Sequence, residues 1–409
     1  MVMKIRKLGM VLEGPLSHDG MNFLYSEGEG YYIDSIARFY DEIVLYAYVL
    51  RAGQTYYDTS AHYRFKSSNI RVVELPLRGE NRYALLAKLA QLRGTWTTIR
   101  RNLASVDAMY IFLPGYPGAL ATRLCRKFKK PYGLYLASDW PEEAALLIPF
   151  RGLIGRILAP LYALATRRIQ DAAVKGAKFV LTAGKLLHDH YSKKSNTPII
   201  ETIPRINWPA YRVYDRTDTC TGDVTHLLFV GYLLERKGAR YFIDSVRILR
   251  DRGVNVAGTI IGTGVEEDNL RGHIAALSLS DHITMMGHVA NGEPLVAEYR
   301  KADIYIFTSY AGEGFPRVLY EAMSQGLPVI CSDVCGISQK LVPDTHAVFV
   351  PPQDANAIAD RVQYIINTPD QRRSLIKGGH DFMRRLIDGG DGGHQLKDLC
   401  DKYIEQRTG

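Results

Sequence analysis

The chain has 409 residues, of which 46% are hydrophobic and 23% are charged. This composition is typical of a folded protein of about two domains and excludes fibrous and intrinsically disordered classes. The net charge of +8 is uneven, because residues 1–205 carry 29 Lys and Arg against 17 Asp and Glu, whereas residues 206–409 carry 22 against 26. The basic first half predicts an acidic partner, and nucleic acid, anionic lipid and a polyanionic substrate all remain open here.

The cysteines and the apolar segments indicate the compartment. The five cysteines are odd in number and lack the C-x-x-C spacing of a zinc site, which favours free thiols in a reducing cytoplasm. No segment approaches the roughly 18 uncharged apolar residues that a membrane-spanning helix needs. The N-terminal segment MVMKIRKLGMVLEG differs from a cleavable signal peptide, because charges interrupt its short apolar stretch. We therefore expect a cytoplasmic protein that does not cross a membrane.

Apolar strand-like runs alternate with helical patterns through the first half of the chain. The strands are expected at residues 5–14, 42–50, 71–77, 108–115, 132–139 and 179–184. Helix-period leucines and isoleucines lie between them, around residues 33–40, 85–92 and 120–128. This alternation predicts a parallel, doubly wound sheet.

The same alternation begins again in the second half, after a polar, Pro-rich stretch at residues 203–224. Further strands are expected at residues 226–231, 257–264, 282–289, 303–309, 327–333 and 346–352. We therefore predict an α/β protein with two Rossmann-like domains facing a central cleft. The expected segments are a first domain at 1–205, a linker at 206–222, a second domain at 223–385 and a tail helix at 386–409.

Two glutamates bracket a turn in the second domain, in the segment 313–321, EGFPRVLYE. Pro316 suits the first turn of a helix, which Gly326 would end, so Glu313 is expected in the loop and Glu321 inside the helix. The two could hold different parts of one ligand whose anionic group faces the helix N-terminus. Alternatively, they are an exposed loop acid and a salt-bridge partner on the helix surface.

Neighbouring strand ends also fit an anionic ligand. Arg236 and Lys237 follow the strand at 226–231, before Gly238, and would place cations at the carboxyl edge of the sheet, where open α/β sheets bind ligands. Gly262 and Gly264 follow the next strand and would allow the backbone to approach a ligand, although a glycine pair alone is a weak signal.

Four motifs of the second domain, taken in order, resemble the retaining glycosyltransferase family 4, which has the two-domain GT-B fold. They lie around residues 231–238, 260–264, 285–289 and 313–333. The resemblance covers about residues 227–352. It implies transfer of a hexose-type sugar from a nucleotide diphosphate sugar to an acceptor, with retention of the anomeric configuration. The chain contains no D-x-D sequence, which fits a mechanism without metal or other cofactor.

The resemblance also assigns roles to individual residues. Glu313 would contact the hydroxyls of the donor sugar, Glu321 the ribose and Lys237 the diphosphate. The remaining donor-binding residues would be Arg236, Gly314, Phe315, Pro316, Arg317, Gly262, Gly264, Gly287 and Val289.

Three positions depart from the family pattern, one of them being Cys335-Gly336 in a loop where the family often has Gly-Gly. Tyr232 stands where the family has Arg, so Arg236 would supply the second cation. Ser138-Asp139 replaces the family's His-Asp after a strand of the first domain, and Asp139 is the candidate to orient or deprotonate an acceptor hydroxyl.

The first domain contains two further candidates. In the loop after the first strand, Gly14 and Gly20 would allow the backbone to approach a ligand, and His18 or Asp19 could touch a sugar; an ordinary strand–helix connection explains this loop equally well. Residues 148–169 are apolar but carry several arginines, and with the basic cluster 125–130 they could lie on an anionic membrane. Alternatively, they pack against the core as buried helices.

The sequence thus predicts a metal-independent retaining glycosyltransferase, peripheral on the inner face of the membrane. Its partners would be a nucleotide-sugar donor, a glycan, lipid-linked or small-molecule acceptor, and an anionic membrane surface. No nucleic-acid recognition module is evident. The alternatives are another GT-B enzyme such as a sugar-nucleotide epimerase, and a non-catalytic nucleotide-sugar or glycan-binding protein.

Overall fold

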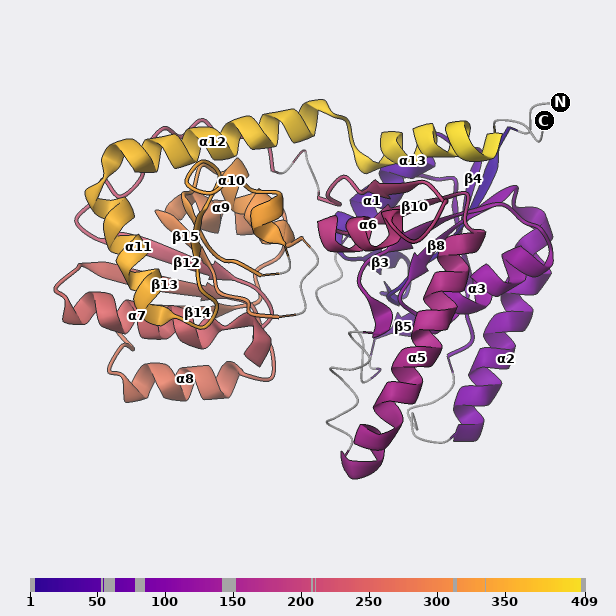
Figure 1. Ribbon diagram of the computed structural model, residues 1–409, viewed down its shortest axis with the longest axis horizontal. Coiled ribbons are helices and arrows are strands. Elements are labelled where there is room, and N and C mark those ends of the chain that lie inside the picture. The colour runs from indigo at the N-terminus through magenta and orange to yellow at the C-terminus, as the bar shows by residue number, and fades with distance from the viewer. Residues whose placement is uncertain are drawn as a thin grey trace. The chain divides into compact units, whose positions relative to one another are not determined.

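The computed structural model describes residues 4–52, 54, 63–77, 85–141, 152–206, 209, 211–311, 315–334 and 336–405. The chain divides into two compact units, the first formed by Met1–Arg205 with Asp391–Gly409 and the second by Ile206–Gly390. Each unit is an α/β structure (Figure 1). The C-terminal segment is therefore part of the first unit, where helix α13 (Gly392–Cys400) packs on α1 (Glu27–Ala37) and is followed by a π-helical turn (Asp401–Glu405).

Unit 1 is built on a seven-stranded parallel sheet. Its strands, in spatial order, are β11 (Ile199–Glu201), β10 (Phe179–Thr182), β9 (Tyr132–Leu136), β8 (Ala108–Leu113), β1 (Lys7–Val11), β4 (Glu42–Ala47) and β7 (Ile70–Glu74). Every residue of β8, β9 and β10 is buried, as continuous apolar strands covered on both faces should be.

Two apolar cores lie on opposite faces of this sheet. One contains side chains of α1 and α13, including Ile33 and Leu396. The other contains side chains from the remaining helices, including Ile99 and Leu124. These helices are α2 (Leu85–Asn102), α3 (Tyr116–Lys127), α5 (Gly152–Gly176) and α6 (Lys185–Ser192).

A second, four-stranded sheet of short strands interrupts the expected alternation. Its order is β5 (Val49–Arg51), β2 (Leu16–His18), β3 (Phe23–Tyr25) and β6 (Tyr63–Arg64). Because β2 follows β1 and β5 follows β4, this small sheet extends from the carboxyl ends of two neighbouring strands of the main sheet.

Unit 2 contains a six-stranded parallel sheet. Its strands, in spatial order, are β14 (Ile283–Gly287), β13 (Val256–Ile261), β12 (Thr225–Val230), β15 (Ile304–Phe307), β16 (Val329–Ser332) and β17 (Val348–Val350). Its helices are α7 (Ala239–Asp251), α8 (Glu267–Ala276), α9 (Glu293–Lys301), α10 (Arg317–Ser324), α11 (Ala355–Asn367) and α12 (Pro369–Asp388). Helices α7 and α8 lie on one side of the sheet, and α9, α10 and α12 on the other (Figure 1).

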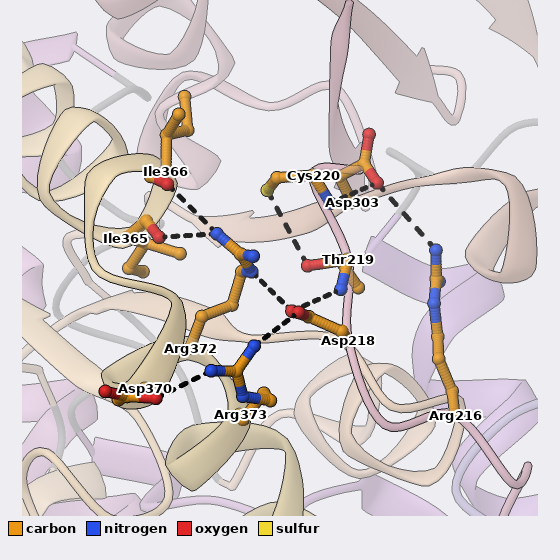
Figure 2. A network of polar contacts seen from close by, with 10 residues as sticks. All are labelled: Arg216, Asp218, Thr219, Cys220, Asp303, Ile365, Ile366, Asp370, Arg372 and Arg373. Carbon is orange, nitrogen blue, oxygen red and sulfur yellow. Dashed lines mark hydrogen bonds and ion pairs between the residues drawn. The ribbon is translucent and has the colours of Figure 1, made fainter. Parts of the chain in front are cut away.

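The segment predicted as a linker is anchored in unit 2 (Figure 2). Asp218 pairs with the buried Arg372 of α12, at 2.6 Å between Oδ1 and Nε. Asp303 accepts hydrogen bonds from the backbone N–H groups of Cys220 and His226, both at 2.8 Å. The polar composition predicted a linker, and these contacts attach it to unit 2 through the side chain of Asp218 and the backbone of Cys220.

Candidate functional site

The switch point of the unit 2 sheet lies between β12 and β15, which are adjacent in space. The chain leaving β12 forms α7 on one face, and the chain leaving β15 forms α10 on the other. In open α/β sheets, ligands bind at the carboxyl edge where the connections diverge in this way. Most of the residues predicted to bind the donor lie on the loops at this edge.

The cationic loop after β12 is held by the segment that follows β15. Residues 235–237 form a short 3₁₀ turn, in which the backbone oxygen of Lys237 accepts a hydrogen bond from Thr308 Oγ1 at 2.9 Å. The N–H of Tyr310 donates to the backbone oxygen of Arg236 at 3.0 Å, and the Arg236 guanidinium donates to the oxygen of Ala311 at 3.2 Å. Two segments that are far apart in the chain therefore meet at one place.

The predicted glycines allow loops to pack against one another. A Cβ on Gly262, at φ +139°, would lie 1.9 Å from the backbone oxygen of Gly231, and one on Gly264 would lie 2.2 Å from that of Leu233. The N–H of Gly262 also donates to the oxygen of Gly287 at 2.8 Å. The close approach inferred from sequence is thus made by neighbouring backbone, and contact of these glycines or of Val289 with a ligand stays a prediction.

Glu321 lies in the second turn of α10 and is only 8% exposed. Its carboxylate accepts a hydrogen bond of 2.9 Å from the hydroxyl of Tyr299, a fully buried residue of α9. Burial, and then the charge of Glu321, raise the pKa of Tyr299 well above its usual range, so this hydroxyl remains a donor. The alternative of a salt-bridge partner on the helix surface is wrong, because Glu321 faces the interior.

The start of α10 carries three predicted residues. Pro316 precedes the first helical residue, Arg317, which is exposed. The ring of Phe315 packs on Tyr320, with 4.6 Å between centroids. Glu313 and Gly314 lie outside the described residues.

Lys340 is an additional cation at this place. Its Nζ lies 4.8 Å from the ring centroid of Phe315 and 5.7 Å from that of Tyr320. Sequence reasoning missed it, because it does not directly follow β16 but lies beyond the short turn after that strand. A search for cations in the whole connection after every strand of the second domain could have identified it.

A cavity of about 310 Å³ lies beside the cationic loop, at the starts of α7 and α8. Its lining residues are Leu234, Glu235, Ala239, Arg240, Tyr241, Glu266, Leu270 and Tyr310. Burial, and then the charge of Glu235, raise the pKa of Tyr310. Glu235 and Tyr310 of this cavity are direct neighbours of Arg236, in the chain and through a backbone hydrogen bond, so the cavity adjoins the cationic loop.

In unit 1, Asp139 follows β9 and contacts α5. Its two carboxylate oxygens accept hydrogen bonds from the guanidinium of Arg167 at 2.7 Å and from the side-chain amide of Gln170 at 3.0 Å. These two bonds fix the position of the carboxylate, and its role in orienting or deprotonating an acceptor hydroxyl stays a prediction. Ser138 Oγ and Arg167 Nη1 are buried, and neither has a hydrogen-bond partner among the residues that the structure describes.

The predicted acceptor loop contains a β-hairpin, which forms part of the connection from β1 to α1. Strands β2 and β3 pair antiparallel, with Gly20 at φ +103° in the turn. Asp19 Oδ1 accepts from the N–H groups of Met21 and Asn22 at 2.8 and 2.7 Å, and these bonds hold the pKa of Asp19 below its usual range. His18 Nδ1 accepts from the N–H of Gly20 at 3.1 Å. Both side chains stabilise the turn, and contact of this hairpin or of the preceding Gly14 with a ligand stays a prediction.

Comparison with known proteins gives a family match for unit 2. Residues 221–382 match the family described as Glycosyl transferases group 1. The chain is 31% identical over 172 residues to the putative colanic acid biosynthesis glycosyltransferase WcaL of Escherichia coli strain K12. It is also 31% identical over 160 residues to the phosphatidyl-myo-inositol mannosyltransferase of Mycobacterium leprae. Each match covers 39% of this chain and 42% of the relative, so the chain spans less than half the length of these curated relatives.

The similarity of fold extends to both units. The crystal structure of Anabaena Alr3699/HepE in complex with UDP and glucose matches with a TM-score of 0.69, over 97% of this chain and all of the other, at 14% identity. The predicted GT-B fold is confirmed. Assignment to family 4 within the group 1 glycosyltransferases stays a prediction.

Proposed function

We propose, from the group 1 glycosyltransferase family that residues 221–382 match, that this chain transfers a hexose-type sugar from a nucleotide diphosphate sugar to an acceptor with retention of configuration. One observation carries the proposal. The loop with Arg236 and Lys237 is hydrogen-bonded to the segment after β15, at the switch point of the sheet and near the chain that leads into α10. This arrangement supports a diphosphate site at the carboxyl edge of the sheet, where the cations of this loop and the N-terminus of α10 would both face the phosphates.

Each element of this site has a chemical task in the proposed reaction. Breaking the bond between the sugar and the diphosphate leaves negative charge on the diphosphate. Lys237, Arg236 and the backbone at residues 315–317 would stabilise that charge without a metal ion. Glu321 would bind the ribose and Glu313 the hydroxyls of the sugar. In unit 1, Asp139, fixed by Arg167, would orient the acceptor hydroxyl.

A thermal-shift panel of UDP, GDP, ADP and dTDP sugars, followed by product analysis, tests the function. We expect one nucleotide series to stabilise the protein, and its sugar to be transferred with retained anomeric configuration in the presence of EDTA. Absence of binding and transfer with every donor would overturn the proposal. Binding without transfer or hydrolysis would support a non-catalytic binding protein, and free epimerised sugar nucleotide would support an epimerase.

We also propose that one face of unit 1 docks on an anionic membrane surface, such as the inner leaflet where a lipid-linked acceptor would lie. Helices α2 and α3 pack side by side. Helix α2 carries four basic residues, α3 carries three, and neither carries an acidic residue. Helix α5 carries four basic residues and one acidic residue, Asp171. Helix α1, on the opposite face, contains Glu27, Glu29 and Asp34 and no Lys or Arg. Charge is thus segregated between the two faces of the sheet.

Helix α5 presents apolar side chains on this basic face. Leu161 is 63% exposed and Leu164 is 50% exposed, and with Ala165 and Arg168 they form a single exposed row at helical spacing. The alternative that this part of the segment packs as a buried helix is wrong for these side chains. No helix in the described part of the chain is long and apolar enough to span a bilayer. An exposed apolar row beside arginines is suited to lying in the interface.

Leu161→Glu should weaken binding to vesicles of anionic lipid at least about tenfold, because each CH₂ buried in the membrane contributes about 0.8 kcal/mol and the new charge is repelled. Co-sedimentation with anionic and with neutral vesicles measures this effect. Tyr364→Glu, which changes a 43% exposed residue of unit 2, is the matched control and should bind as the wild type does. Equal binding to neutral and anionic vesicles, or none to either, would refute the docking.

A further inference from the structure

We infer that Lys340 is a positioning residue, which holds the ring of Phe315 and thereby the backbone that enters α10. The inference rests on the proposed function, in which residues 315–317 bind the donor diphosphate. Nζ of Lys340 lies over the Phe315 ring, at 4.8 Å from its centroid. A cation in this position is attracted by the negative face of the ring.

The backbone of Lys340 is firmly placed. It ends a short 3₁₀ turn, Ile337–Gln339, and its N–H donates to the oxygen of Ile337 at 3.0 Å. Ile337 is 1% exposed and Leu341 is fully buried, so core side chains flank Lys340 in the chain. Gly336 precedes the turn at φ +75°, a conformation that favours glycine. The ammonium group therefore extends from a fixed anchor.

A second contact also fixes the Phe315 ring. The ring packs on Tyr320, which is 1% exposed and stacks on Phe382 of α12 at an interplanar angle of 5°. Phe315 thus contacts both a buried aromatic stack and the ammonium group of Lys340, which also lies 5.7 Å from the centroid of Tyr320. Pro316 follows with its φ near −67°, which its own ring restricts, so the contacts of Phe315 act directly on the residue that precedes this fixed position. Without Lys340, the partly exposed Phe315 ring would lose one of its contacts.

A double-mutant cycle of Lys340→Met and Phe315→Leu tests this role, with the affinity for the nucleoside diphosphate of the cognate donor as readout. Lys340→Met should weaken diphosphate binding about 3- to 30-fold, the range of a cation–π contact. It should leave binding of the corresponding nucleoside and the thermal midpoint unchanged. Lys340→Arg should restore affinity to within about twofold of wild type, because Arg also stacks on aromatic rings. Lys340→Met added to Phe315→Leu should have little further effect.

Lys402→Met is the matched control, because Lys402 lies over Tyr403 at 5.1 Å in unit 1, in the same kind of contact. It should bind the diphosphate as the wild type does. Additive losses in the cycle would show that Lys340 contacts phosphate directly and would overturn the inference. If Lys340→Met lost the same affinity for the nucleoside as for the nucleoside diphosphate, or lost none for either, the inference would also be overturned. Wild-type protein that binds no nucleotide would overturn the proposed function together with the inference.

Discussion

Glu321→Gln is expected to weaken binding of the nucleoside diphosphate about 10- to 150-fold, which corresponds to the roughly 1.5–3 kcal/mol of hydrogen bonds to a charged group. The substitution removes the charge but keeps an oxygen that can accept the hydrogen bond of Tyr299. Glu321→Ala would instead leave that buried hydroxyl without its acceptor and mix a loss of stability into the binding result. Isothermal titration calorimetry, together with a denaturation curve for each variant, separates the two effects.

A donor analogue without ribose hydroxyls tests whether the binding free energy lost in Glu321→Gln comes from contact with the ribose. If Glu321 binds the ribose, the 2′,3′-dideoxy form of the nucleotide should bind equally to wild type and to Glu321→Gln. Tyr299→Phe is the structural control, since it leaves the carboxylate in place but removes its buried donor. It should lower stability by about 1–3 kcal/mol and change affinity less than Glu321→Gln does. Equal losses for both nucleotide forms would contradict ribose binding.

Glu313→Ala completes the comparison, because it should impair transfer and leave nucleotide binding largely intact. Identical effects of changes at Glu313 and Glu321 would argue against separate tasks for the two glutamates.

The long parallel strands could be predicted from sequence because their signal is local. Strands such as β8 and β15 are continuous apolar runs followed by turn residues. The hairpin of β2 and β3 was missed because each strand has only three residues, and His18, Asp19 and Gly20 at its turn have the composition of a loop. Short strands depend on their neighbours for stability, and the partners β5 and β6 come from later parts of the chain, beyond α1 and β4.

The residues of the candidate site that could be predicted are those within one contiguous motif. Glu321 is recognisable by its spacing from Glu313 along the chain. Nothing in that motif, however, indicates that Glu321 is buried against Tyr299, which belongs to another helix. Lys340 shows the same limit, since its partner Phe315 belongs to a different loop, the one before α10. The return of α13 to unit 1 is likewise a tertiary result, because the apolar face of this helix could pack against either unit.

Arg372→Met should lower the free energy of unfolding of unit 2 by about 3–5 kcal/mol, the usual result of removing one partner of a buried ion pair. The Arg372 side chain is 5% exposed and donates to Asp218 at 2.6 Å. It also donates to the backbone oxygens of Ile365 and Ile366 at 3.1 and 3.0 Å, at the end of α11 (Figure 2). The substitution would remove the charged partner of Asp218 Oδ1, which among the described residues would keep only the N–H of Thr219 at 2.9 Å, and would take the Arg372 donor away from both backbone oxygens. Hydrogen-exchange mass spectrometry of α11 and α12 should show the loss, with exchange in β8 and β9 as the internal reference.

The adjacent arginine provides the control for this prediction. Arg373 binds the other oxygen of Asp218 at 3.0 Å, but its side chain is 48% exposed. Arg373→Met should therefore cost no more than about 1 kcal/mol, as exposed pairs do. Similar losses for both arginines would mean that the contact with Asp218, rather than burial and the contacts with α11, determines the effect.

The pH dependence of the same variant tests the role of Asp218. Burial raises the pKa of Asp218, but the hydrogen bond from Arg372 and further bonds outweigh it, so its pKa lies below the ordinary value of 3.8. A lowered carboxyl pKa contributes stability that is fully present above the unfolded-state pKa and is lost as the pH falls through the folded-state value. The difference in stability between wild type and Arg372→Met should therefore be constant from pH 7 to about pH 5 and shrink below about pH 4. A difference that stayed constant to pH 2 would assign the stabilisation to the contacts of Arg372 with α11, because these do not titrate.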